Sequence, residues 1–214
     1  MKRTAEVLVI GGGPVGLFAA ISLLERGVSV RVLDAAPERM VRSYACGLHP
    51  ETLRAFDRVG LLPAVLDTAH RIDRLSVRDG AAPRVVAELS ALEGGTPYAL
   101  SMRQFDLEEI LEDALQRRDG AVSRHHSVTR LSLRDGCVRV GAAVSGGTHS
   151  AARSAAPNPA VVELEADYVI GADGHYSICR QALGIEALPV RATRAFAVCD
   201  FQAEACAKRR RYRR

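Results

Sequence analysis

The sequence predicts an α/β fold in which helices cover a parallel sheet and a β-meander is added to it. Three observations predict this fold class. The apolar run from Val7 to Ile10 is followed at once by a cluster of glycines and then by apolar residues at helical spacing. A second apolar run, residues 28–33, ends at Asp34 and completes a strand–helix–strand unit. Three later extended runs, the first beginning at Val128, predict the meander.

The elements of the N-terminal half follow from apolar spacing and from helix stop signals. Leu17, Ala20, Ile21 and Leu24 share one helical face, and Gly27 ends that helix. The elements predicted next are a helix over residues 50–59 and strands over residues 72–77, 84–89 and 98–102.

The C-terminal half begins with a strong helix pattern that starts near Leu107 and stops at Gly120. The meander strands are predicted at residues 128–133, 138–140 and 161–164. Residues 141–160 are predicted to be a flexible surface insertion, because 15 of these 20 residues are Gly, Ala, Ser or Pro. A last buried strand over residues 168–170, a turn over 171–174 and a short helix over 177–183 complete the prediction.

The composition is that of a globular protein. With 48% hydrophobic and 25% charged residues, a mostly disordered chain is excluded. The five cysteines are widely spaced and form no CxxC pair, which argues against a disulfide scaffold or a zinc ribbon. No metal site is predicted, and a reducing, cytoplasmic location is expected. A signal peptide in the apolar run that follows Lys2 and Arg3 is disfavoured, because the glycine motif explains the same residues.

The net charge of +4 is misleading, because six basic residues stand in the last seven positions and the rest of the chain carries about −2. The abrupt change of composition there favours a truncated or frame-shifted end over a basic arm for nucleic acid or an anionic membrane. We therefore expect no nucleic-acid partner and no membrane partner, and the oligomeric state stays open. The predicted domains are residues 1–185 and the truncated start of a second domain at residues 186–214.

The glycines at positions 11, 13 and 16 form a Gly-x-Gly-x-x-Gly motif between a predicted strand and a predicted helix. Gly11 allows the tight turn, Gly13 lets the backbone approach a pyrophosphate, and Gly16 lets the helix pack close to the strand. Pro14 fits the first helical turn, where its missing N–H is not needed. The alternative, an ordinary glycine-rich turn, is disfavoured because strand, helix and acid all fall at the expected places.

Asp34 lies at the end of the second predicted strand, 18 residues after Gly16. A carboxylate there can accept hydrogen bonds from both ribose hydroxyls of an adenosine, and it would repel a 2′-phosphate. The sequence therefore predicts a Rossmann-type dinucleotide cradle. The cradle alone does not separate FAD from NAD.

The segment Asp167 to Arg180 favours FAD over NAD. It resembles the signature of the FAD-dependent aromatic hydroxylases, the group A flavoprotein monooxygenases of the p-hydroxybenzoate hydroxylase type, in which an Asp-Gly is followed by a Ser and an Arg. Here these residues are Asp173, Gly174, Ser177 and Arg180. The residues agree with this resemblance, because ligands bind at the carboxyl ends of strands in open α/β sheets. Asp173 could accept from ribityl or ribose hydroxyls, Ser177 could cap the next helix, and Arg180 could bond backbone carbonyls or Asp173.

The resemblance implies further FAD-binding residues: an arginine at Arg42, a residue before the strong helix at Arg103 or Gln104, and a backbone contact to adenine at Val128. Glu51 stands where the family often has arginine, so the chain departs from the pattern there. The full predicted FAD-binding set is Gly11, Gly12, Gly13, Pro14, Val15, Gly16, Asp34, Ala35, Arg42, Arg103, Gln104, Val128, Asp173 and Gly174.

The resemblance implies that NADH or NADPH reduces the FAD and that the reduced flavin hydroxylates an aromatic or polyketide-like substrate with O₂. It also implies that residues 72–102 include a small β insertion on the substrate side. The family's third FAD motif, a Gly-Asp, has no counterpart in this chain. Three alternatives therefore stay open: a non-catalytic nucleotide-binding remnant, an NAD-dependent dehydrogenase, and a related flavoenzyme such as a halogenase or a geranylgeranyl-type reductase.

No catalytic residue is predicted. His125 and His126 are interpreted as surface histidines, and His175 as a loop histidine. Cys179 is expected in the core, as an unreactive thiol.

Overall fold

The computed structural model describes residues 3–39, 45–79, 82–93, 96–134, 136–145 and 160–187. The elements in chain order are β1 (Val7–Ile10), α1 (Pro14–Leu24), β2 (Val30–Leu33), β3 (Ala45–Leu48), α2 (Pro50–Arg58), α3 (Leu62–Thr68), β4 (His70–Ile72), β5 (Arg74–Asp79), β6 (Ala82–Glu88), η1 (Leu89–Ala91), β7 (Ala99–Arg103), α4 (Gln104–Gln116), β8 (Val122–Ser123), β9 (His126–Arg134), β10 (Cys137–Val144), β11 (Ala160–Ala166), β12 (Tyr168–Gly171) and α5 (Ile178–Ala182).

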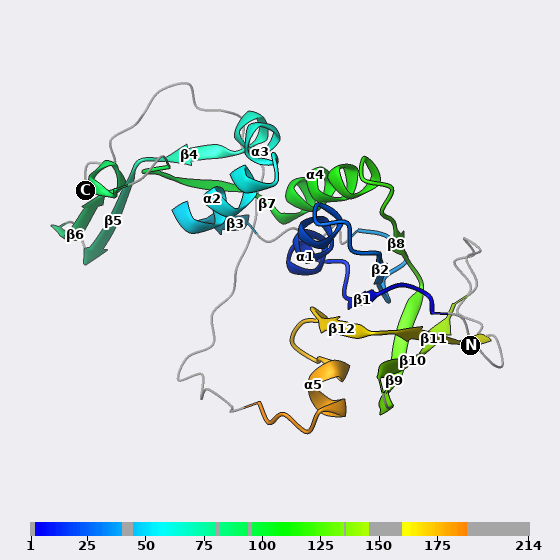
Figure 1. Ribbon diagram of the computed structural model, residues 1–214. Coiled ribbons are helices and arrows are strands. Elements are labelled where there is room, and N and C mark those ends of the chain that lie inside the picture. The colour runs from blue at the N-terminus through cyan, green and yellow to red at the C-terminus, as the bar shows by residue number, and fades with distance from the viewer. Residues whose placement is uncertain are drawn as a thin grey trace, which may run out of the picture.

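A four-stranded parallel sheet of order β12-β1-β2-β8 forms the centre of the fold (Figure 1). In its register, Val9 of β1 lies between Val32 of β2 and Ile170 of β12. The first strand of the chain therefore pairs with a strand about 160 residues later. The predicted α/β class with a parallel sheet is confirmed.

The sheet is covered on both faces. Helices α1 and α4 pack on one face, and the antiparallel sheet β11-β10-β9 lies with α5 on the other (Figure 1). Successive side chains of β1 point to opposite faces of the sheet and so belong to different hydrophobic clusters. Val7 and Val9 pack with the helices, and Leu8 and Ile10 pack under the antiparallel sheet. A strand buried on both faces reads as a continuous apolar run, which is why the sequence shows no polar alternation there.

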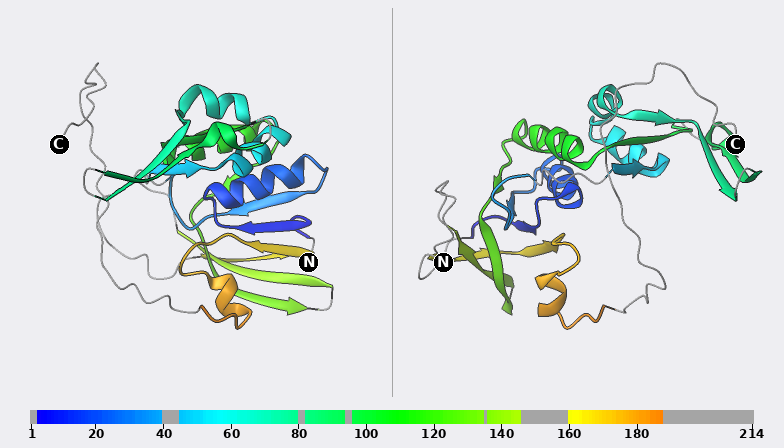
Figure 2. Two further views of the ribbon diagram at one scale, coloured as in Figure 1. Left: turned by 90° about the vertical axis from the view of Figure 1, so that its left-hand side faces the viewer. Right: turned by 180° about the vertical axis from the view of Figure 1, so that it is seen from behind.

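The rest of the described chain forms a smaller unit of two sheets and two short helices. The strands β3, β7 and β4 pair in that order, α2 and α3 lie beside them, and β5 and β6 form a separate two-stranded sheet. Figure 2 shows the β5–β6 pair at the end of this unit that is distant from the parallel sheet.

The structure corrects three element predictions. The strand predicted over 72–77 is two strands, β4 and β5, that join different sheets and are separated at Asp73. The predicted flexible insertion at 141–160 begins too early, because β10 continues to Val144 and pairs with both β9 and β11. Residues 146–159 lie outside the described residues. The last strand, predicted as buried, leaves Tyr168 70% exposed, because β12 is an edge strand.

Four elements were not predicted: β3, α3, β8 and the 3-10 turn η1. Residues 188–214, which include the predicted start of a second domain and the basic tail, lie outside the described residues. Of the helices in the described ranges, none combines the length and the apolar character that a membrane crossing requires.

Candidate dinucleotide-binding site

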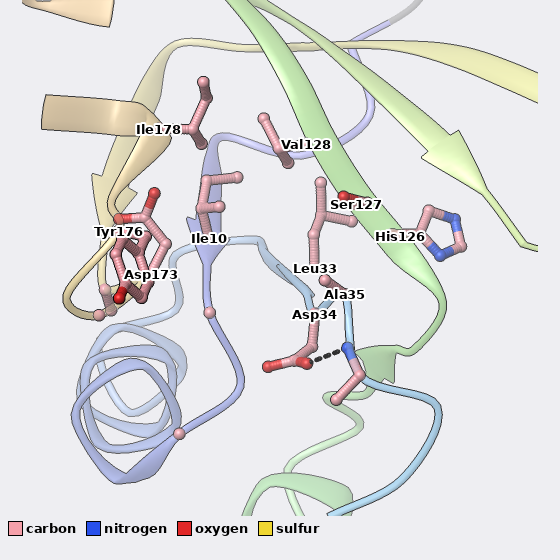
Figure 3. Close-up of a pocket in the computed structure, with 15 residues that line it drawn as sticks. Ile10, Leu33, Asp34, Ala35, His126, Ser127, Val128, Asp173, Tyr176 and Ile178 are labelled. Carbon is pink, nitrogen blue, oxygen red and sulfur yellow. Dashed lines mark hydrogen bonds between the residues drawn. The ribbon is translucent and has the colours of Figure 1, made fainter. Parts of the chain in front are cut away.

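A cavity of about 440 Å³ opens at the carboxyl ends of β1, β2 and β12 and at the start of β9. Figure 3 shows Asp173 and Tyr176 on one side of it, Ser127 and His126 on the other, and Asp34 between them. The residues that line it are Ile10, Gly11, Gly13, Leu33, Asp34, Ala35, Ala36, His126, Ser127, Val128, Ala172, Asp173, Gly174, Tyr176 and Ile178. The two predicted motifs, more than 150 positions apart in the sequence, therefore meet at one cavity.

The turn between β1 and α1 depends on glycine at two positions. Gly11 has a φ of +107°, and a Cβ on it would lie 2.2 Å from the carbonyl oxygen of Ala172. A Cβ on Gly16 would lie 2.0 Å from the carbonyl oxygen of Gly11. Both distances are far below van der Waals contact, so the turn, helix α1 and the end of β12 approach one another as only glycine permits.

Gly13 is different, because a Cβ on it would meet no atom of the described chain within 4 Å. Gly13 is also the N-cap of α1, whose first turn holds Pro14, no acidic residue and no side-chain cap. The free N–H groups of this helix start carry the positive end of the helix dipole. The space beside Gly13 therefore fits an anionic group such as a pyrophosphate.

The Asp34 carboxylate lies beside this turn and is 16% exposed. One carboxylate oxygen accepts a hydrogen bond from the backbone N–H of Gly12, and the other accepts from that of Ala36 at 2.7 Å. A carboxylate offers about four acceptor positions, so about two remain for a ligand. The carboxylate is thus fixed in place and still able to accept from the two hydroxyls of a ribose.

The turn after β12 is held by its own hydrogen bonds. The Asp173 carboxylate accepts from the Ser177 hydroxyl at 2.7 Å and from the backbone N–H of Cys179 at 3.0 Å. The Ser177 Oγ caps α5 by accepting from the backbone N–H of Arg180 at 2.9 Å, and the Arg180 guanidinium donates to the carbonyl of His175 at 2.8 Å. The expected cap and the expected arginine brace are both present. Asp173 uses an acceptor position on each oxygen for the turn itself.

The pKa of Asp173 lies below its ordinary value. Burial acts to raise this pKa, but the hydrogen bonds from Ser177 and the backbone outweigh it and stabilise the carboxylate. Since the folded pKa is the lower one, the carboxylate stabilises the fold at neutral pH. This contribution is lost as the pH falls through the folded pKa.

We expect Asp173→Asn to lower the free energy of unfolding by about 1–3 kcal/mol at pH 7, because one amide N–H₂ then faces a hydrogen-bond donor. Urea unfolding at pH 7 and at acid pH measures this loss, which should shrink as the wild-type carboxylate becomes protonated. Asp167→Asn is the control, since its ion pair with Arg3 lies at the surface. Equal losses for the two variants at pH 7 would contradict the prediction.

Of the other predicted site residues, Ala35, Val128 and Gly174 line the cavity, whereas Gly12, Pro14, Val15, Gly16, Arg103 and Gln104 do not. Val15 is 73% exposed. The Arg103 guanidinium makes two hydrogen bonds to Asp106, and the Gln104 amide donates to Glu108. Arg42 lies outside the described residues. The roles of all these residues toward FAD stay predictions.

The cavity also contains residues that the sequence did not identify: Leu33, Ala36, Ser127, Ala172, Tyr176 and Ile178 among them. His126 was interpreted as a surface residue, but it is half-buried and lines the cavity. A hydrogen bond from its backbone N–H to the carbonyl of Asp34, at 2.8 Å, holds His126 at the end of β2. This contact joins residues 92 positions apart, so no local signal in the sequence could have shown it.

Cys179 is buried as expected, and burial raises the pKa of its thiol to about 12. Within the described part of the chain, no group of three His, Cys, Asp or Glu side chains is arranged to hold a metal ion.

Comparison with known proteins gives a consistent result. The model of a family described as FAD binding domain matches residues 4–211. A flavin-dependent monooxygenase of Mycobacteroides abscessus is 33% identical over 190 residues, which are 84% of this chain and 37% of that protein. A para-nitrophenol 4-monooxygenase of a Pseudomonas species is 29% identical over 86% of this chain and 44% of its own length. The chain thus spans less than half the length of these relatives.

Solved structures show the same fold. The p-nitrophenol 4-monooxygenase of Pseudomonas putida superposes with a TM-score of 0.75 at 26% identity, over 86% of this chain and 44% of that one. The anhydrotetracycline hydroxylase of Streptomyces rimosus superposes with a TM-score of 0.70 at 27% identity, over 84% of this chain and 34% of that one. In both cases the match covers the larger part of this chain and the smaller part of the other.

Proposed function

Since the chain belongs to the FAD binding domain family and its relatives are FAD-dependent aromatic monooxygenases, we propose that it forms the FAD cradle of an NAD(P)H-dependent monooxygenase. The proposed substrate is a small aromatic or polyketide-like compound, as the names of a pentachlorophenol 4-monooxygenase and an anhydrotetracycline hydroxylase among the relatives suggest. The observation that carries the proposal is the open space beside Gly13 at an uncapped helix start, with a fixed carboxylate next to it.

In this proposal the cavity holds the adenosine diphosphate half of FAD and the start of the ribityl chain. The N–H groups at the start of α1 would hold the pyrophosphate, and Asp34 would accept from the adenosine ribose. The half-buried Val128 would lie beside the adenine (Figure 3). The turn that carries Asp173 and Gly174 lies against Gly11, on the side where the ribityl chain would leave the pyrophosphate.

Bound FAD supplies the redox chemistry, which is the transfer of electrons from the nicotinamide donor toward O₂. The part of the chain that the structure describes would bind the adenosine diphosphate half of FAD. This binding would fix the position from which the ribityl chain and the flavin ring extend. Its residues work by position and charge, and we assign none of them a proton transfer.

We expect Gly13→Ala to reduce FAD affinity about 10-fold or more, because the new methyl group meets only the space that the pyrophosphate would fill. The free energy of unfolding should fall by no more than about 1 kcal/mol, the cost of alanine in place of glycine at the N-cap. Visible absorption after addition of FAD and desalting measures retention of the flavin, and urea unfolding measures stability. A wild-type chain that retains no flavin would overturn the proposed function. Equal retention by the variant would contradict the placement of the pyrophosphate.

The electron donor is tested on the FAD-loaded protein without oxygen. Loss of the oxidised flavin spectrum on addition of NADH or NADPH would support the donor part of the proposal and would show which of the two is used. A spectrum unchanged by both would overturn that part alone and leave FAD binding intact.

A further inference from the structure

Three carboxylates and two guanidinium groups gather behind the cavity. They are Asp34 at the end of β2, Glu108 and Glu112 on α4, Arg39 in the loop after β2, and Arg124 in the turn between β8 and β9. We call this set the acid–arginine cluster. It joins the end of β2 to α4 and to the turn after β8, and only Asp34 among its members lines the cavity.

Arg124 is the member that connects the cluster to the site. One of its terminal nitrogens lies 3.6 Å from the Asp34 carboxylate, and the other donates a hydrogen bond to Glu112. The side chains of Arg124, Asp34 and Glu112 are only 18, 16 and 15% exposed, so water screens these charges weakly.

The backbone around Arg124 is held to the same strand end. The N–H of His126 donates to the carbonyl of Asp34 at 2.8 Å, and the N–H of His125 donates to that of Ala36 at 3.2 Å. The Arg124 side chain therefore starts from a point fixed relative to Asp34. A guanidinium held by Glu112 on one side and facing Asp34 on the other has little freedom to turn elsewhere.

The charge balance also requires this arginine. The pKa of Glu108 is raised by burial, and the nearby charges of Glu112 and Asp34 act in the same direction while Arg124 acts against them. Without Arg124, Asp34 and Glu112 would be like charges near one another and near the buried Glu108. Like charges at partly buried positions repel, so the carboxylates would move apart.

We propose that Arg124 is a positioning residue, which holds the Asp34 carboxylate oriented so that its free acceptor positions face the two ribose hydroxyls of the adenosine half of FAD. This inference rests on the proposed function. Arg124 does not itself line the cavity, and its fork is occupied by Glu112 and Asp34, so it acts through Asp34 and not by touching a phosphate.

The experiment compares four ligands (FAD, FMN, ADP and 2′-deoxy-ADP) on the wild-type chain and on Arg124→Met, by calorimetric titration. FMN lacks the adenosine, and 2′-deoxy-ADP lacks one of the two hydroxyls. We expect Arg124→Met to weaken FAD and ADP binding about 10-fold and to leave FMN binding unchanged. The wild-type preference for ADP over 2′-deoxy-ADP should largely disappear in the variant, which a general loss of stability would not cause.

Arg39→Met is the matched control. Arg39 also pairs with Glu112, at 3.4 Å, and with Glu109, at 3.0 Å. This variant removes one positive charge from the same cluster, but the charge does not face Asp34, so the preference for ADP over 2′-deoxy-ADP should persist. Arg124→Lys serves if Arg124→Met does not fold, because one ammonium keeps the charge but cannot reach both carboxylates in fork geometry, and the preference should then be partly retained.

The outcomes separate the two proposals. A wild-type chain that binds neither FAD nor ADP would overturn the proposed function and this inference with it. If the wild type binds FAD and ADP and Arg124→Met binds both equally well, the inference is overturned and the proposed function stands. A variant that weakens ADP and 2′-deoxy-ADP equally, with FMN also affected, would also overturn it and show that Arg124 supports only the fold.

Discussion

Replacing Gly16 with alanine is expected to lower the free energy of unfolding by about 3 kcal/mol, the upper part of the range for overpacked positions. The new Cβ would lie 2.0 Å from the carbonyl oxygen of Gly11 and 3.2 Å from the Cγ1 of Val9. Gly→Ala in a helix usually stabilises by up to about 1 kcal/mol, so a net loss would come from the close approach alone. Relief would require α1 to move away from β1, which would open the buried cluster around Leu17.

Urea unfolding monitored by circular dichroism measures this loss. Gly13→Ala is the control, because both glycines belong to the same motif and only Gly16 lies against backbone atoms. The two substitutions should separate stability from binding: Gly16→Ala impairs folding first, and Gly13→Ala impairs mainly ligand binding. Equal midpoints for the two variants would show that α1 does not pack on the turn as closely as the structure has it.

Asp34→Ala is expected to weaken FAD binding about 100-fold or more. Two ribose hydroxyls that donate to a charged acceptor contribute about 1.5–3 kcal/mol each, and both hydrogen bonds are lost together. The substitution also removes the acceptor for the backbone N–H groups of Gly12 and Ala36, so the turn after β1 loses its tie to the end of β2. The effect on FAD should therefore exceed that of Gly13→Ala.

Flavin fluorescence during titration with FAD measures the affinity of the variant. Asp73→Ala is the matched control, because it also removes one aspartate, but from an exposed ion pair with Arg71. FMN, which has no adenosine ribose, should lose less affinity than FAD in Asp34→Ala. An Asp34→Ala chain that retains FAD as well as the wild type would mean that the ribose is bound elsewhere.

The cradle could be predicted from the sequence because its determinants are local. The strand, the three glycines and the following helix lie within 18 consecutive residues, and the close approach of the backbone requires glycine at positions 11 and 16. Asp34 was predicted for the same reason, since it ends the next strand. The second motif was found by its resemblance to a family, and the structure places Ser177 and Arg180 in the roles expected of them.

The misses have a common physical cause, which is that tertiary pairing decided the local structure. Gly141, Ala142 and Ala143 have low strand propensity, but β9 and β11 pair with them on both sides, and Ala142 is fully buried. Small residues are what such a crowded central strand accommodates. Likewise, residues 72–77 show one continuous extended pattern in the sequence. The structure divides this pattern into β4 and β5 because the two strands pair in different sheets.

Arg124 illustrates the limit of sequence reasoning for the site. Its partners, Asp34 and Glu112, come from other elements, and no spacing rule links the three residues. An arginine in a polar stretch is most simply interpreted as a solvated side chain. Its position behind the cavity becomes evident only when β8 is paired with β2.

The pairing of β1 with β12 also determines the order in which the molecule can be completed during its synthesis. The central strand leaves the ribosome among the first residues, but its second neighbour and Ala172, which lies against Gly11, follow about 160 residues later. At ordinary elongation rates this interval is roughly 10–30 s. Throughout it, Leu8 and Ile10 lack part of the surface that finally covers them, so the nascent chain is expected to depend on chaperones until β12 has been made.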